Sequence, residues 1–164
     1  MYQIGQKIVY GIHGVCSIVD LEEKKIDKKT ICYFVLEPID QPGSRYYVPS
    51  ENQAALAKLR PLSTREELQS LLTSPLAENV WIADENRRKQ YYRELVSSVN
   101  LKAMIDMIRC LRLHRRQQME QGRKFHQCDE NFLRDAQKTL STEIAMVMEI
   151  PDDQVDTYLQ AVFE

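Results

Sequence analysis

The residues that could carry catalysis are few and scattered along the chain. His13, His114 and His126 lie far apart, and none has a Cys or Ser partner at a motif spacing. The motifs GxSxG, GxxxxGK, HExxH and GxGxxG do not occur. The carboxylate pairs Asp129-Glu130 and Asp152-Asp153 lie near predicted helix starts, where negative charge complements the helix macrodipole. We therefore expect no enzymatic activity, and we expect His114 and His126, which lie among basic residues, to be solvated.

The four cysteines, Cys16, Cys32, Cys110 and Cys128, are widely spaced and include no CxxC pair. Structural zinc sites need clustered ligands, and disulfide scaffolds are dense in cysteine. The spacing instead predicts buried free thiols, with no metal and no cofactor.

The 164 residues suffice for one or two domains. No apolar run approaches the roughly 18 residues that indicate a membrane span. The first residues, MYQIGQKIVYG, lack the basic-then-apolar layout of a signal peptide. These features predict a cytoplasmic protein.

The net charge of −2 conceals two blocks of opposite sign. Residues 87–124 contain 11 Lys/Arg and 3 Asp/Glu, whereas residues 125–164 contain 2 Lys/Arg and 9 Asp/Glu. The blocks could pair with each other within a helical hairpin, or the basic block could face a polyanion. Both interpretations stay open.

The first half of the chain has the pattern of a small β domain. Charged residues 22–29 predict a hydrophilic turn, and residues 30–36 are apolar on both faces, which predicts a strand covered on both sides. Short strands in fewer than 50 residues indicate a small, strongly bent barrel. Strands are predicted at 7–11, 14–21, 30–36 and 45–48, the last ended by Pro49.

The second half has helical periodicity. Ser63-Thr-Arg-Glu66 fits a capping box, and Pro151 lies where a proline opens a helix. The fold class is therefore α+β, with a β domain at about 1–58 and an all-α domain at about 62–164. Helices are predicted at 50–59, 63–72, 84–97, 100–120, 129–149 and 151–163.

Several short motifs follow one another in a characteristic order: Ile4-Gly5, Val9-Tyr10, His13-Gly14, Tyr33-Phe-Val-Leu36 and Val48-Pro-Ser-Glu-Asn52. Together with the helical half, they resemble the CarD family of bacterial transcription regulators, which includes the CdnL proteins. The similarity continues through Arg87-Arg88, residues 106–111 and residues 136–145. The family's β half is a Tudor-like module shared with the transcription-repair coupling factor.

This resemblance implies binding to the β subunit of RNA polymerase by the pairing of sheet edges. Exposed edges offer unpaired N–H and C=O groups, so a partner strand can be added there. Tyr46 and Tyr47 point to opposite faces of the sheet, so one is predicted to be core and the other exposed. The polymerase-binding residues implied are Lys24, Tyr46, Tyr47, Val48 and Pro49.

The resemblance also implies that the helical half contacts promoter DNA in the minor groove, where the family uses a tryptophan wedge. Glu85 occupies the wedge position here, and the only tryptophan is Trp81, one helical turn earlier. Trp81 either packs against a neighbouring helix or replaces the wedge if residues 76–84 reach the groove. The DNA-binding residues implied are Trp81, Arg87, Arg88, Lys89 and Arg93, which could also form a solvated helix surface.

The function predicted from the sequence is therefore regulation of transcription initiation through RNA polymerase, with DNA contact by the helical half. The alternative is a polymerase-binding adaptor that has lost direct DNA binding.

Overall fold

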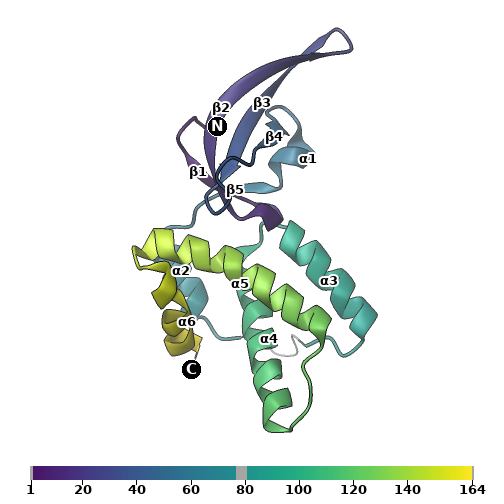
Figure 1. The fold of residues 1–164 in the computed structure, drawn as a ribbon, viewed down its shortest axis with the longest axis vertical. Helices are drawn as coiled ribbons and strands as arrows, with labels where there is room; N and C mark the ends of the chain where they lie inside the picture. The colour runs from purple at the N-terminus through teal and green to yellow at the C-terminus, as the bar shows by residue number, and fades with distance from the viewer. Residues whose placement is uncertain (1, 77–80, 164) are drawn as a thin grey trace. The chain divides into compact units, whose positions relative to one another are not determined.

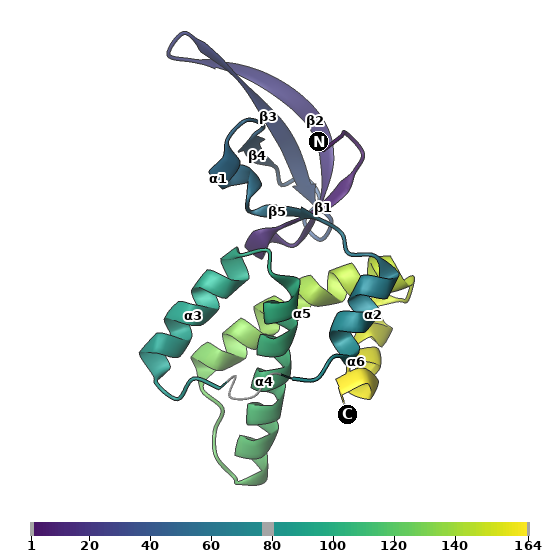
Figure 2. The same ribbon diagram turned by 180° about the vertical axis from the view of Figure 1, so that it is seen from behind.

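The computed structural model describes residues 2–76 and 81–163. The chain forms two compact units, Met1–Leu62 and Ser63–Glu164. The first unit is a sheet with one short helix, and the second is helical (Figures 1 and 2). This arrangement confirms the α+β class. The first unit ends at residue 62 rather than 58, because residues 59–61 form a strand that pairs with the first strand of the sheet.

The first unit is an antiparallel five-stranded sheet with the order β4-β3-β2-β1-β5. β4 and β5 are its edges, so the sheet is open and the expected closed barrel is not formed. A register shift between Ile18 and Asp20 marks a β-bulge in β2, a feature that bends and twists a strand. The strands are β1 (Lys7–Tyr10), β2 (Val15–Ile26), β3 (Lys29–Pro38), β4 (Tyr46–Pro49) and β5 (Leu59–Pro61).

The predicted turn over residues 22–29 is wrong, because β2 and β3 continue as a long hairpin and only Asp27 and Lys28 turn. Both of these residues have positive φ, 49° and 66°, as a two-residue hairpin connection requires. The hairpin reaches beyond the rest of the sheet (Figure 1). Its charged side chains are compatible with strand structure because almost all of them are exposed to solvent.

The main core cluster of the first unit lies on one face of the sheet, and Val9, Val15 and Val35, which alternate with its residues along the strands, are also buried. Seven buried side chains form this cluster: Ile8, Cys16, Ile18, Phe34, Leu36, Val48 and Leu59. The predicted helix over 50–59 is only one turn, α1 (Gln53–Leu56), because Leu59 already belongs to β5. The Asn52 side chain caps α1 by accepting a hydrogen bond from the Ala55 N–H.

The second unit contains five α-helices among its described residues. Its capping box consists of Thr64 and Glu67, one residue later than predicted from the sequence. In both views α2 and α6 lie on one side of α4, and α3 lies on the other (Figures 1 and 2). The helices are α2 (Arg65–Thr73), α3 (Glu85–Ser97), α4 (Leu101–Glu120), α5 (Gln127–Met148) and α6 (Val155–Phe163), with a 3₁₀ turn at Asp152–Gln154 before α6.

The core of the second unit is built from the apolar stripes of these helices. Ile105, Ile108 and Leu111 of α4 pack with Leu133, Leu140 and Ile144 of α5, and all six side chains are buried. The cysteines are free thiols, of which Cys16 and Cys110 are buried while Cys32 and Cys128 are half-buried. Within the described ranges, none of the helices is long and apolar enough to cross a membrane.

Candidate functional site

The outer edge of β4 is the first candidate surface. The Ser50 N–H donates to the Cys32 carbonyl of β3 over 2.9 Å. Alternate residues of an antiparallel strand bond to the same neighbour, so Val48 and Tyr46 direct their backbone groups toward β3. Tyr47 and Pro49 therefore direct theirs outward. Pro49 has no N–H to offer there, a property typical of edge strands.

The side chains of β4 alternate between the core and an exposed face. Val48 is buried, and Tyr46 packs against the core, whereas Tyr47 is 41% exposed. The sequence prediction that one tyrosine is core and the other exposed is thus confirmed. Tyr46 also contacts the His13 ring, with the ring centroids 4.1 Å apart. His13 therefore supports the edge strand from the core side.

Lys24, Tyr33 and Tyr47 form a cluster on the face of the sheet opposite the main core cluster. The Lys24 Nζ lies 3.8 Å from the Tyr47 ring centroid and 5.8 Å from that of Tyr33. The two tyrosine rings meet edge to face with centroids 6.4 Å apart. The cluster thus joins β2, β3 and β4, and it places a cation and two aromatic rings beside the outward backbone of Tyr47. Tyr33 was not among the polymerase-binding residues predicted from the sequence.

The sequence motifs of the first half have structural roles in positioning this edge. Gly5 has φ of 89°, and its N–H donates to the Ile18 carbonyl over 2.7 Å. Gly14 has φ of 74°, a conformation that glycine adopts without strain, and it follows His13 at the turn into β2. Val48 is core, and Asn52 caps α1.

Comparison with known families decides the identity of this unit. Residues 2–63 match the family model of the CarD-like/TRCF RID domain. The N-terminal unit belongs to this family. The resemblance drawn from the sequence is confirmed at this level, and the match supports an RNA polymerase-interacting role. The comparison with curated proteins gave no match.

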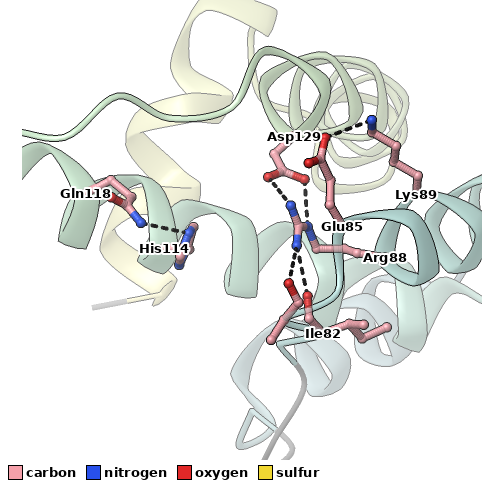
Figure 3. A network of polar contacts seen from close by, with 8 residues as sticks. Ile82, Glu85, Arg88, Lys89, His114, Gln118 and Asp129 are labelled. Atoms are coloured by element: carbon pink, nitrogen blue, oxygen red, sulfur yellow. Dashed lines mark hydrogen bonds and ion pairs between the residues drawn. The ribbon is translucent and has the colours of Figure 1, made fainter.

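The second candidate surface is the start of α3, where the resemblance to the CarD family implies DNA contacts. Arg88 is not on the surface: its side chain is 4% exposed, and that of its partner Asp129 on α5 is 1% exposed. Arg88 Nε and Nη2 donate to the two Asp129 carboxylate oxygens, each over 2.9 Å, and Nη1 donates to the Ile82 carbonyl (Figure 3). Burial alone would lower the pKa of Arg88, but the bonds to Asp129 hold it above its usual range. The prediction that Arg88 contacts DNA is therefore wrong for this structure, because its guanidinium is not available to a phosphate.

Trp81 is partly buried and packs against the same network. Its ring stacks on His114 with centroids 3.7 Å apart and an interplanar angle of 20°, and the Arg88 guanidinium lies 4.4 Å from its centroid. It also packs against the core of the second unit. These contacts favour the packing interpretation of Trp81 over the wedge interpretation. Residues 77–80 of the segment 76–84 lie outside the described residues.

The expectation that His114 is solvated is wrong, because the residue is half-buried by its stack on Trp81. Its ring also bonds to the Gln118 side-chain amide over 3.1 Å (Figure 3). Burial lowers the pKa of His114 below its usual range, although the nearby Asp129 carboxylate acts in the opposite direction. His126 is exposed.

The remaining predicted DNA-binding residues of α3 differ in exposure. Arg87 and Arg93 are exposed, whereas Lys89 is half-buried and forms an ion pair with Glu85 over 2.8 Å. The hydrogen bond from Lys89 lowers the pKa of Glu85, which therefore stays charged at the wedge position. Of the five residues predicted, the structure leaves two arginines free to approach DNA on this helix.

The structure supports internal pairing of the two charge blocks, and a polyanion-facing role of the basic block stays a prediction. Three ion pairs join the basic block to the acidic block: Arg88 with Asp129, Arg112 with Asp156 and Arg115 with Glu130. Arg116, Arg123 and Lys124 are exposed. Among the described residues, no group of three or more His, Cys, Asp or Glu is placed to hold a metal ion.

Proposed function

We propose that this protein is a cytoplasmic, non-enzymatic transcription regulator that binds the β subunit of RNA polymerase through the outer edge of β4. The observation that carries the proposal is the outward backbone of Tyr47 on an edge strand within a domain of the RID family. A strand of the partner can extend the sheet there, because main-chain hydrogen bonds make little demand on sequence. The Lys24–Tyr33–Tyr47 cluster would add side-chain contacts beside the new strand.

The test separates the backbone of Tyr47 from its side chain. Tyr47→Pro removes the outward N–H without removing a bond to β3, and Pro49 shows that β4 accommodates proline at an outward position. Tyr47→Val removes the same aromatic ring but keeps the N–H. Binding of the full chain to immobilised core polymerase and to purified β subunit is measured by interferometry, and circular dichroism checks the fold of each variant.

We expect Tyr47→Pro to weaken binding about tenfold more than Tyr47→Val, since one interface hydrogen bond is worth up to about 1.5 kcal/mol. Equal affinities of the two variants would refute edge pairing. Binding to core polymerase without any binding to the β subunit would refute the choice of subunit while leaving the RID assignment intact.

A second candidate function, an RNA polymerase-binding adaptor without DNA contact, is supported by a specific observation. Arg88 and Trp81 are held by Asp129 and His114, and a charged Glu85 lies where the family's tryptophan wedge is expected. A carboxylate is repelled by phosphates and cannot stack on a base. The helical unit would then act through protein contacts.

Binding to a fluorescent promoter fork, with and without polymerase, distinguishes the two functions. If Arg87 and Arg93 contact phosphates, the logarithm of the affinity should fall with the logarithm of the salt concentration with a slope of about −1.8, and the double variant Arg87→Glu/Arg93→Glu should abolish this slope. The adaptor function predicts no binding to the fork by the chain alone and equal recruitment of wild type and double variant by polymerase.

A further inference from the structure

A groove between α4 and α6 combines positive charge with apolar surface. It has a volume of about 550 Å³, and most of its lining residues belong to α4 and α6. In both views α6 and α3 lie on opposite sides of α4 (Figures 1 and 2). Arg109, Arg112, Arg115 and Arg116 contribute to the lining of the groove, together with Leu113, Met119 and Phe163. We call this surface the α4–α6 groove. The groove takes no part in the proposed polymerase contact. Arg87 and Arg93, the arginines proposed to approach DNA, lie on α3 and do not line it.

The charge of the α4–α6 groove is unbalanced. Among the residues that the structure describes, its lining contains four arginines and a single carboxylate, that of Glu120. Arg112 forms an ion pair with Asp156 over 3.3 Å, and Arg115 forms one with Glu130 over 3.2 Å. Arg116 is exposed and forms no ion pair with any residue that the structure describes. The groove is therefore complementary to an acidic ligand.

The arginines of the groove are largely held in place before any ligand arrives. Arg109 donates to the Ser74 carbonyl, and Arg112 donates to Gln137 as well as to Asp156. The guanidinium carbons of Arg109 and Arg112 lie 5.3 Å and 5.8 Å from the Phe163 ring centroid. Side chains that are already ordered lose less conformational freedom on binding, which favours a specific complex.

The apolar part of the groove indicates what kind of acidic ligand fits. Met119 is 70% exposed and Leu113 is 40% exposed, and both flank the arginines. Contacts to a nucleic-acid backbone come from charged and polar groups, which leave exposed Met and Leu side chains without a role. Protein interfaces, in contrast, are enriched in Arg, Met and aromatic residues.

We infer that the α4–α6 groove binds an acidic amphipathic segment of a partner protein. Bulky apolar side chains of the segment, spaced as on one helix face, lie against Leu113, Met119 and Phe163. Its flanking carboxylates pair with Arg116 and with Arg109 or Arg112. This site is independent of polymerase binding by the first unit, so the failure of one proposal does not affect the other.

The probe is a fluorescent synthetic peptide of about four helical turns, with Leu and Phe at i, i+3, i+4 and i+7 and with Glu and Asp at the positions that flank this apolar face. Three matched probes accompany it: a peptide of the same composition with its apolar residues dispersed, a polyglutamate peptide, and a short DNA duplex. Anisotropy is measured with the full chain and with Arg116→Glu, Met119→Ser and Leu113→Ser, which alter exposed side chains. Arg134→Glu changes the charge equally on an exposed arginine of α5 and serves as the control.

We expect the amphipathic peptide to bind, Arg116→Glu and Met119→Ser each to weaken it about tenfold, and Arg134→Glu to change it less than about twofold. Equal binding of the dispersed peptide or polyglutamate would overturn the inference. Binding of the duplex that depends on Arg116 but not on Met119 would assign the groove to nucleic acid instead. Absence of peptide binding at about millimolar concentration, corresponding to only about −4 kcal/mol, would also overturn it.

Discussion

The buried pair of Arg88 and Asp129 makes the stability of the helical unit sensitive to a single charge. Asp129→Asn keeps the size of the side chain but removes its charge. The Arg88 guanidinium, 4% exposed, would then lie in the core beside a neutral amide. Arginine does not lose its proton in proteins, so the uncompensated charge must stay buried or the region must open to water.

The magnitude follows from the geometry of the pair. The two parallel bonds of 2.9 Å and the near-complete burial of both side chains fit the class of buried pairs in which removal of one partner costs about 3–5 kcal/mol. Replacement of both charges, Arg88→Met with Asp129→Leu, removes the desolvation cost as well. The double variant loses the stacking of Arg88 on Trp81, worth about 0.5–2 kcal/mol. We therefore expect it to be more stable than Asp129→Asn.

Urea unfolding followed by tryptophan fluorescence measures these differences in the helical unit, because Trp81 is the only tryptophan of the chain. The expected free energies of unfolding are about 3–5 kcal/mol below wild type for Asp129→Asn and within about 2 kcal/mol of wild type for the double variant. Asp135→Asn is the matched control on α5, since Asp135 is exposed and forms an ion pair with exposed Arg134. Its effect should be below about 1 kcal/mol.

A loss of less than about 1 kcal/mol in Asp129→Asn would refute the structural role of the pair. Arg88 would then be available to a ligand, and the DNA contact implied by the sequence resemblance would regain its central residue. A double variant as unstable as Asp129→Asn would show instead that the packing around the pair, rather than the charge, sets the stability.

Three further outcomes follow from single side chains. Tyr92 is fully buried, and its hydroxyl has no hydrogen-bond partner among the described residues, so Tyr92→Phe should raise the free energy of unfolding by about 1 kcal/mol in urea titrations; a decrease would indicate a bonding partner. Burial lowers the pKa of His114 from 6.5, so the unfolded chain takes up the proton first as the pH falls below 6.5. The stability reported by Trp81 should therefore fall from pH 6.5 downward, and His114→Phe should remove this slope; a persistent slope would assign it to another group. Glu85→Trp should lengthen the lifetime of open promoter complexes, because base stacking is worth about 1–3 kcal/mol, and an unchanged lifetime would place α3 away from the DNA.

The elements of the helical unit were predictable because their apolar residues recur with a clear period. α4 and α5 begin and end within two residues of the ranges predicted from the sequence. The hairpin of β2 and β3 was missed because charge was equated with a turn. A strand with solvent on both faces carries no apolar alternation, and only the pairing of residues 22–26 with 29–33 defines it. The sequence pattern also could not predict that the sheet is open, because the number of strands does not determine whether the two edge strands pair with each other.

The contacts of Trp81, His114, Arg88 and Asp129 could not be predicted from local spacing, because they join three helices and the segment before α3. Arg88 and Asp129 are 41 positions apart, and no motif connects them. The family resemblance even pointed the other way, by grouping Arg88 with Arg87 as a basic patch. On a helix, however, adjacent residues point about 100° apart, so two neighbouring arginines need not share a surface.

A signal for the buried pair was nevertheless present in the periodicity. Arg88 lies four residues before Tyr92 and seven before Leu95, and all three are the buried residues of α3. Asp129 likewise lies four residues before Leu133 and seven before Ala136 on the buried face of α5. A cation in phase with one apolar stripe and a carboxylate in phase with another predict a buried pair, because a charge in the core needs a partner.

The helical periodicity of buried and exposed positions also distinguishes two kinds of variant in the helical unit. Substitutions at Glu85, Arg87 and Arg93 alter the exposed face of α3 and can change DNA contact without opening the core. Substitutions at Trp81 and Arg88 remove contacts that hold α3 to α4 and α5, so a loss of function in them would follow from lost stability whether or not DNA is bound. Only variants of the exposed residues can therefore distinguish a regulator that contacts DNA from an adaptor that does not. The contacts of the buried residues Trp81 and Arg88 explain why the unit can keep its fold while its wedge position carries the carboxylate of Glu85.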